Sequence, residues 1–181
     1  MNKKNDLQVS VFGSGCFWCA EAIFSQLKGI ESVTSGYAGG NKPNPTYQQV
    51  CTDTTGHAEV VRIVFDPTII TYADLLEIFW QMHDPTTPNR QGNDVGSQYR
   101  SIILYVDQDQ KITAQKMLTK LEERKVFESD IVTEIQPLRE FYPAEEYHKQ
   151  YYFQNNMQPY CQFVISPKLE KFKKNFKEKL A

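Results

Sequence analysis

The expected elements run strand, helix, strand, strand, helix, strand, an order that predicts an α+β fold with a ferredoxin-like core. Short β-rich apolar runs alternate with segments whose apolar residues recur every three or four positions. The 181 residues fit one domain and contain no internal repeat, low-complexity tract or linker. We therefore expect a single domain over residues 1–181, with helices on one face of a sheet and a flexible N-terminus at residues 1–6.

The first half of this core consists of two expected strands around one helix. Residues 7–12 form a short apolar run that is typical of a strand. A helix over residues 16–28 follows, and Gly29 is suited to end it. Its apolar residues recur at helical spacing, at Phe17, Ala20, Phe24 and Leu27. Residues 30–37 are expected to form the second strand.

The second half of the core repeats this pattern. Residues 57–65 form a β-rich run. A helix over residues 71–83 is predicted because Thr71 is a good N-cap residue and Asp74 follows three positions later. Residues 101–106 then form the fourth strand of the core.

The rest of the chain is expected to decorate the core with extra helices and a long C-terminal tail. We predict a helix near residues 108–125, a strand near 131–136, and a last helix that starts at Ser166. The tail before that helix is predicted to be loop-rich and aromatic. Residues 83–99 show no periodicity, and a loop of this length in a compact domain is usually functional.

Composition excludes several classes of function. The net charge is -2 and no basic stripe is present, which argues against nucleic acid as a partner. No apolar run approaches the ~20 residues of a membrane span. The first six residues are polar and lack the apolar core of a secretory signal, so we expect a cytoplasmic protein. In that compartment the four cysteines are expected to be redox-active or buried rather than a disulfide framework.

One cysteine stands out because of its position. Cys16 follows a Gly-Ser-Gly turn at the point where the first helix is expected to begin. The amides at that end lack partners inside the helix, and the helix dipole is positive there. We therefore expect a lowered pKa for the Cys16 thiol and some thiolate near neutral pH. Because Phe17 and Trp18 follow at once, the sulfur should lie beside an apolar pocket.

Two further residues have alternative readings. On a strand that starts at residue 57, Glu59 shares its face with three apolar side chains, a setting that raises the pKa of a carboxylic acid. A solvent-exposed glutamate fits the spacing equally well. Cys19 forms Cys-x-x-Cys with Cys16, so it is either a second redox thiol or a small residue facing the core. Cys51 is expected to be a buried packing residue.

The segment Gly15-Cys16-Phe17-Trp18 resembles the signature of the A-type peptide methionine sulfoxide reductases. The resemblance extends from about residue 8 to the C-terminus. Further blocks follow in the family's order, at Gly36-Tyr37-Ala38-Gly39-Gly40, Pro43-Asn44-Pro45-Thr46-Tyr47, Gly56-His57-Ala58-Glu59, His83-Asp84-Pro85-Thr86, Arg90-Gln91-Gly92-Asn93-Asp94, Gly96-Ser97-Gln98-Tyr99-Arg100-Ser101, Phe141-Tyr142-Pro143-Ala144-Glu145 with His148, and Tyr160-Cys161. This resemblance implies that the fold is an α/β roll with a ferredoxin-like core.

The resemblance also implies an activity, the reduction of peptide-bound and free methionine-S-sulfoxide to methionine in the repair of oxidised proteins. Cys16 would attack the sulfoxide sulfur and become a sulfenic acid. Glu59 would donate a proton to the oxygen. Tyr47 and Tyr99 would donate hydrogen bonds to the same oxygen.

The remaining implied roles concern substrate binding and regeneration. Phe17 and Trp18 would form the apolar wall around the methyl group, and Asp94 would lie near the substrate backbone. Cys161, or alternatively Cys19, would convert the sulfenic acid to a disulfide. Thioredoxin would reduce that disulfide, with no cofactor and no metal, in a protein expected to be a monomer. The tail before Cys161 contains less glycine than is usual in the family.

Two other function classes share parts of this pattern. A thioredoxin-like oxidoreductase also uses Cys-x-x-Cys, but its tryptophan directly precedes the first cysteine, whereas Trp18 lies between the two. A structural zinc site needs four ligands, usually as two close pairs. Beyond Cys16 and Cys19, the candidate ligands His148 and Cys161 are far apart in the sequence. Both classes are therefore disfavoured. None of the three histidines is assigned a catalytic role.

Overall fold

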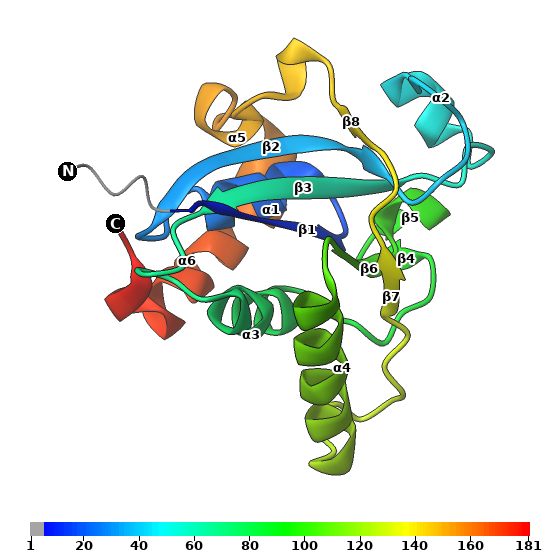
Figure 1. Ribbon diagram of the computed structural model, residues 1–181. Coiled ribbons are helices and arrows are strands. Elements are labelled where there is room, and N and C mark those ends of the chain that lie inside the picture. Colours follow the sequence, from blue (N-terminus) through cyan, green and yellow to red (C-terminus); the bar gives the residue numbers. More distant parts are fainter. Residues whose placement is uncertain (1–5) are drawn as a thin grey trace.

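The computed structural model describes residues 6–181, so the N-terminus predicted to be flexible lies, apart from Asp6, outside the described residues. A curled six-stranded sheet has the order β7-β6-β1-β3-β2-β8 (Figure 1). β6 and β7 pair in parallel, and the other neighbouring strands are antiparallel. The strands are β1 (Gln8–Ser14), β2 (Ile30–Ala38), β3 (Ala58–Phe65), β6 (Ser101–Tyr105), β7 (Glu134–Pro137) and β8 (Phe141–Pro143).

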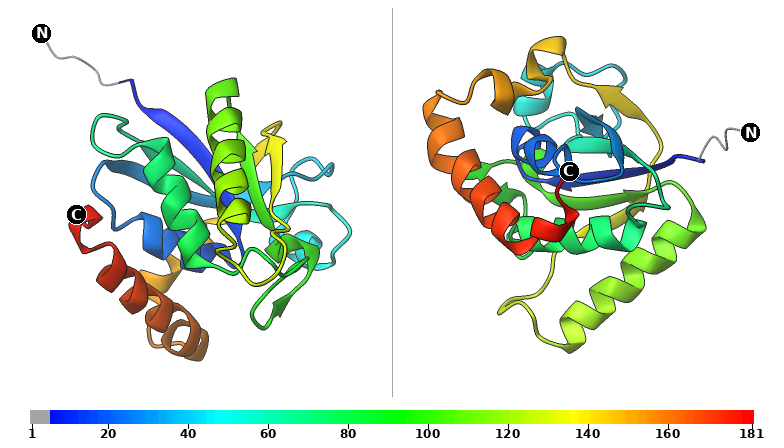
Figure 2. Two further views of the ribbon diagram at one scale, coloured as in Figure 1. Left: turned by 90° about the horizontal axis from the view of Figure 1, so that it is seen from below. Right: turned by 90° about the vertical axis from the view of Figure 1, so that its left-hand side faces the viewer.

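The main core lies between one face of this sheet and the helices. Side chains alternate between the two faces of a strand, so Phe12 belongs to the main core, whereas Val11 belongs to a smaller cluster on the opposite face. Leu138 and Phe141 pack against that smaller cluster. Four of the helices that contribute side chains to the main core lie around the sheet in Figure 2: α1 (Phe17–Phe24), α3 (Tyr72–Met82), α4 (Gln108–Glu123) and α6 (Ser166–Asn175).

Two local signals place the start of a helix as predicted. Thr71 caps α3, and its hydroxyl and the Asp74 carboxylate form a reciprocal capping box. Cys16 is the N-cap residue of α1. The preceding Gly15 has φ +97°, and an added Cβ would lie 2.7 Å from Cγ of Gln91. Only glycine fits this turn, so the turn fixes where Cys16 leaves the sheet.

The segment without periodicity is ordered by short elements that the sequence did not reveal. A two-stranded ribbon joins β4 (Arg90–Gln91) and β5 (Asp94–Val95), and the 3-10 turn η1 (Ser97–Tyr99) follows it. A short helix, α2 (Tyr47–Cys51), was also not predicted.

The prediction of a loop-rich tail before the last helix was wrong, since much of the segment between β8 and α6 is helical. It contains η2 (Glu146–His148), α5 (Tyr151–Gln154) and a π-helical turn η3 (Cys161–Ile165). The last helix, α6, starts at Ser166 as predicted, and η4 (Lys177–Lys179) follows it. Two aromatic residues of this segment, Tyr151 and Tyr160, pack against Trp18. Elements of three to five residues are too short to show an amphipathic period. None of the helices within residues 6–181 is both long and apolar enough to cross a bilayer.

Candidate functional site

The structure gathers most of the predicted site residues around the start of α1. Cys16 is buried at the N-cap of α1, and β3 brings Glu59 beside it. Electrostatic interactions join Tyr99, on the turn η1, to both Cys16 and Glu59. Tyr47, the first residue of α2, also interacts with Glu59. Four segments that are distant in the sequence therefore supply one site.

Glu59 is buried, as expected for a carboxylic acid with a raised pKa, and is not the solvent-exposed glutamate that the sequence also allowed. The residue is 1% exposed, and its Oε2 accepts a hydrogen bond of 3.0 Å from the backbone N–H of Phe17. Burial raises the pKa of Glu59 to about 8. The hydrogen bond from the Phe17 amide acts to lower this pKa, and the nearby charge of Asp94 acts to raise it. Glu59 therefore holds a proton at neutral pH, as a general acid must.

The lowered pKa that we expected for Cys16 is wrong. Burial raises the pKa of the Cys16 thiol well above its ordinary value, and interactions with Glu59 and Cys19 raise it further. Hydrogen bonds from the backbone of Trp18 and the hydroxyl of Tyr160 act in the opposite direction. The loss of water outweighs the helix N-terminus, so the free protein carries a thiol here at neutral pH.

The two predicted tyrosines are both partly buried. Burial raises the pKa of Tyr47 and of Tyr99, and the neighbouring Glu59 adds to both shifts. Their hydroxyls therefore stay protonated and can donate hydrogen bonds to an oxygen near Glu59.

The aromatic residues after Cys16 have different surroundings. The ring of Phe17 is buried among the rings of Tyr37, Tyr47 and His148. Trp18 is only partly buried, and the ring of Tyr151 stacks on its indole at 3.7 Å with an interplanar angle of 8°. Phe17 is thus a packing residue, whereas part of the Trp18 side chain stays exposed.

The sequence did not reveal the role of His148 in holding this indole. Nδ1 of His148 accepts a hydrogen bond of 3.0 Å from Nε1 of Trp18. A neutral imidazole that accepts at Nδ1 carries its proton on Nε2, and that atom is buried without a partner among the described residues. His148 is 1% exposed, and burial lowers its pKa. Its position between Phe17 and Tyr47 could have been suspected only from the motif that contains it.

A second tyrosine–carboxylate pair was also not predicted from the sequence. The hydroxyl of Tyr160 donates a hydrogen bond of 2.6 Å to Oδ2 of Asp94, and it also hydrogen-bonds the Cys16 sulfur. Asp94 is thus brought to the site, as predicted, but with Tyr160 beside it. The only sequence signal for Tyr160 is that it precedes Cys161.

Glu145 connects three segments that border the site. Its carboxylate accepts hydrogen bonds from the Tyr37 hydroxyl, the Tyr47 amide and the Tyr147 hydroxyl, at distances of 3.1, 3.1 and 3.0 Å. Burial favours the neutral acid, but these hydrogen bonds outweigh it and hold the pKa of Glu145 below its ordinary value. The anion therefore fixes α2, and with it Tyr47, against β2.

The four cysteines are all free thiols. Cys19 and Cys161 are both buried and belong to one apolar cluster, and electrostatic interactions join Cys16 to Cys19 and Cys19 to Cys161. Cys161 is therefore adjacent to Cys19 rather than part of the group around Cys16. The prediction that Cys51 is buried was wrong, because Cys51 ends the exposed helix α2, where Val50 is the buried residue.

The other two histidines support the fold. Nδ1 and Nε2 of His83 lie 2.6 and 2.7 Å from the Phe79 carbonyl and the Ser101 hydroxyl. His57 likewise links two loop segments, through the Gly40 amide and the Lys42 carbonyl. Within residues 6–181, no three His, Cys, Asp or Glu side chains form a group that could hold a metal ion.

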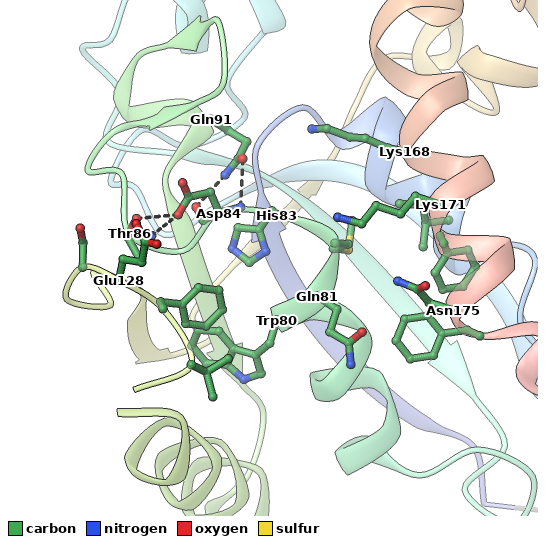
Figure 3. Close-up of a pocket in the computed structure, with 17 residues that line it drawn as sticks. Trp80, Gln81, His83, Asp84, Thr86, Gln91, Glu128, Lys168, Lys171 and Asn175 are labelled. Atoms are coloured by element: carbon green, nitrogen blue, oxygen red, sulfur yellow. Dashed lines mark hydrogen bonds between the residues drawn. The ribbon is translucent and has the colours of Figure 1, made fainter. Parts of the chain in front are cut away.

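A pocket of about 710 Å³ lies away from this chemistry, between α3, the segment 126–129 and α6 (Figure 3). None of the predicted site residues lines it. One of its lining residues is Lys168, whose cation interacts with Cys19. The site is therefore the partly open group around Cys16, not this pocket.

Comparisons with known proteins agree with this site. The family profile described as peptide methionine sulfoxide reductase matches residues 8–180. "Peptide methionine sulfoxide reductase MsrA" of Sulfolobus acidocaldarius is 59% identical over 173 residues, which cover 96% of this chain and 97% of the relative. The protein of the same name from Nautilia profundicola is 56% identical over 91% of this chain and 94% of its own length.

Solved structures give the same result. Methionine sulfoxide reductase A of Corynebacterium diphtheriae superposes with a TM-score of 0.77 and 36% identity, over 87% of this chain and 79% of that one. Mxr1 of Saccharomyces cerevisiae in its reduced form superposes with a TM-score of 0.78 and 30% identity, over 89% of this chain and 92% of that one. The profile match and the identity to these relatives both span most of the chain, so the chain belongs to the peptide methionine sulfoxide reductase family.

Proposed function

We propose that Cys16 is the nucleophile with which this chain reduces methionine-S-sulfoxide, in peptides and as the free amino acid, to methionine. The chain is an enzyme of the peptide methionine sulfoxide reductase family. The observation that carries the assignment is the adjacency of a buried thiol and a buried carboxylic acid that is protonated at neutral pH. One group attacks sulfur while the other supplies the proton that the departing oxygen needs.

The chemical step divides between these two groups. The sulfur of Cys16 bonds to the sulfoxide, the sulfur–oxygen bond of the substrate breaks, and the oxygen remains on Cys16 as a sulfenic acid. Methionine leaves in reduced form, and Cys16 is oxidised by the same two electrons. Glu59 donates its proton to the oxygen as negative charge develops there.

Four side chains orient the substrate for this step. Tyr47 and Tyr99 donate hydrogen bonds to the sulfoxide oxygen. Trp18, backed by Phe17, provides the apolar wall for the methyl group and the side chain of methionine. Asp94 lies at the part of the site suited to the amide of the substrate backbone. The asymmetry of these partners around the sulfur is the basis for selecting one epimer.

Regeneration requires a second thiol and an external reductant. Cys161 or Cys19 attacks the sulfenic sulfur, releases water and forms a disulfide. A dithiol protein of low potential such as thioredoxin, at about -270 mV, can reduce such a disulfide. The sequence resemblance implies this partner, and yeast Mxr1 has been crystallised in complex with Trx2.

We also propose that β6, β1, β3 and β2, with α1 and α3 as connecting helices, form a ferredoxin-like core within a single domain. The antiparallel order of these strands supports the description. Monomeric state and cytoplasmic location stay predictions.

The test is reduction of a peptide methionine-S-sulfoxide with dithiothreitol as the reductant, followed by chromatography of the peptide. Wild type should produce the methionine peptide, and Cys16→Ser should produce none. Cys51→Ser is the matched control, because it removes an exposed thiol and should retain activity. Full activity in Cys16→Ser would overturn the assignment of the nucleophile.

A further inference from the structure

The pocket of about 710 Å³ between α3, the segment 126–129 and α6 has no part in the proposed reaction. Its volume lies within the roughly 300–1,000 Å³ of pockets that bind small molecules. Lys168, Lys171, Phe172 and Asn175 line it from α6, and their spacing of three and four residues places them on one face of that helix. This face gives the pocket two cations beside an aromatic ring.

The two lysines of this face have no acidic partner. Within residues 6–181, neither Lys168 nor Lys171 forms an ion pair, whereas Lys173 on the same helix pairs with Glu170 at 3.6 Å. Figure 3 shows both lysine side chains on the α6 side of the pocket, opposite Glu128. The pocket therefore contains positive charge that the protein does not neutralise.

The other titratable groups that line the pocket leave this positive charge in place. The carboxylate of Asp84 accepts hydrogen bonds of 2.6 and 2.9 Å from the hydroxyl and the amide of Thr86, which hold its pKa below its ordinary value. Asp84 and Glu128 are both exposed, so water screens their charges. His83 is neutral at pH 7, because burial lowers its pKa to about 4. The two acids are thus solvated, and neither needs a cation from a ligand.

The rest of the wall is largely aromatic. Trp80 from α3 is 3% exposed, Phe172 and Phe176 from the opposite side are also buried, and Phe127 is half-buried. Nε1 of Trp80 is a buried donor without a hydrogen-bond partner among residues 6–181. Native structures leave few such donors unpaired, so an acceptor on a bound molecule would complete this wall.

From these observations we propose that the pocket is a binding site for a small aromatic carboxylate. The carboxylate group accepts hydrogen bonds from Lys168 and Lys171. The aromatic ring packs against Trp80, Phe127 and Phe172. None of the predicted site residues lines the pocket, so the proposal does not depend on the proposed function.

Lys168 connects this pocket to a thiol next to the site. Its cation favours the thiolate of Cys19, whose pKa burial raises to about 11. A carboxylate bound to Lys168 neutralises that cation, so the Cys19 thiol becomes still less acidic. Because the thiolate is the reactive form, Cys19 should then react several-fold more slowly with iodoacetamide. The ligand would thereby regulate the reactivity of Cys19.

Calorimetric titration of the wild type with 3-phenylpropanoate tests the site. 3-Phenylpropanamide has nearly the same shape without the charge, and 3-phenylpropylamine has the opposite charge. We expect the carboxylate to bind about tenfold or more tightly than the amide, because the amide cannot form charge-assisted hydrogen bonds with the lysines. Equal binding of these two compounds, tighter binding of the amine, or no binding of the carboxylate at millimolar concentrations would overturn the proposal.

Substitutions on α6 locate the bound carboxylate. Replacing both lysines, by Lys168→Met and Lys171→Met, removes the charges and keeps long side chains, and should weaken binding about tenfold or more. Lys174→Met is the matched control, because this exposed lysine of α6 does not line the pocket, and it should bind as tightly as wild type. Equal losses in the double variant and the control would show attraction by the helix as a whole and would refute the site.

Trp80 reports occupancy of the pocket directly. The chain has two tryptophans, so Trp18→Phe leaves Trp80 as the only one. Its emission should change as 3-phenylpropanoate is added, because the indole lines the pocket. Unchanged emission at concentrations where calorimetry detects binding would place the ligand elsewhere and overturn the proposal.

Alkylation tests the effect on the thiol. The rate at which iodoacetamide modifies Cys19 is measured by mass spectrometry of peptides, with and without saturating 3-phenylpropanoate. Cys51 is the internal control, because this exposed thiol does not line the pocket and its rate should stay the same. An unchanged rate at Cys19 would refute the regulation, although the binding site would stand.

Discussion

Replacing Glu59 with Gln tests whether this side chain holds a proton at neutral pH. Gln has nearly the shape of Glu and keeps an oxygen that can accept the hydrogen bond from the Phe17 amide, but it has no acidic proton. Burial raises the pKa of Glu59 to about 8, against an ordinary value of 4.5. The native protein therefore keeps a proton over about 3.5 pH units in which the unfolded chain has released it.

The sign of the effect on stability follows from this difference. A group that binds its proton more tightly in the native state contributes stability that is present below the unfolded pKa and is lost as pH rises toward the folded pKa. At about 1.4 kcal/mol per pH unit, the loss is on the order of 5 kcal/mol between about pH 4.5 and pH 8. E59Q lacks this loss, so it should be more stable than wild type at alkaline pH and equally stable at acid pH.

Urea denaturation of both proteins between pH 4 and pH 8.5 measures the difference. Glu31→Gln is a matched control on β2, because Glu31 is exposed and its replacement should leave the pH dependence unchanged. The activity of E59Q should fall by about 10²–10⁴-fold, since the proton donor is gone. If wild type and E59Q lost stability in parallel as pH rose, Glu59 would be ionised at neutral pH and its role as acid would be refuted.

Three further substitutions test other parts of the site. Gly15→Ala introduces a Cβ that lies 2.7 Å from Gln91 at φ +97°, so we expect the free energy of unfolding to fall by about 1–3 kcal/mol in urea titrations; an unchanged value would mean that the turn relaxes freely. His148→Phe removes the acceptor of the Trp18 indole, so KM for the peptide sulfoxide should rise several-fold and the tryptophan fluorescence should shift; a change in kcat alone would contradict a positioning role. Tyr99→Phe should lower kcat by about 10-fold or more with little change in KM, because its hydroxyl acts on charge that develops in the transition state; steady-state kinetics that show only a higher KM would contradict this.

The sequence predicted the strands and the paired helices because their signals are local. Alternation places Glu59 and Ile63 on the same face of β3, and the structure buries both. Thr71 and Asp74 form a capping box whose two members lie three residues apart. Such patterns depend only on neighbours in the chain, so they can be recognised without knowledge of the tertiary fold.

The features that were not predicted are formed by contacts between segments that are distant in the sequence. The raised pKa of Cys16 results from burial under other elements, and no helix-end rule contains that information. The acceptor of the Trp18 indole is His148, 130 residues away. Cys161 meets Cys19 only because a π-helical turn, which has no sequence pattern of its own, packs on α1. Each of these features depends on a contact between distant segments, which cannot be recognised from local patterns in a single sequence.

The raised pKa values of Cys16 and Glu59 are compatible with catalysis because the two groups need never be charged together. Before the substrate binds, burial keeps both protonated at neutral pH. During the reaction Glu59 gives its proton to the sulfoxide oxygen, and the proton that Cys16 loses can restore Glu59 to the acid. The oxygen then stays on Cys16 with its proton, so the step from thiol and sulfoxide to sulfenic acid and methionine takes up no proton from water. A pair of buried groups that would repel as anions can therefore perform this step without a net charge entering the site.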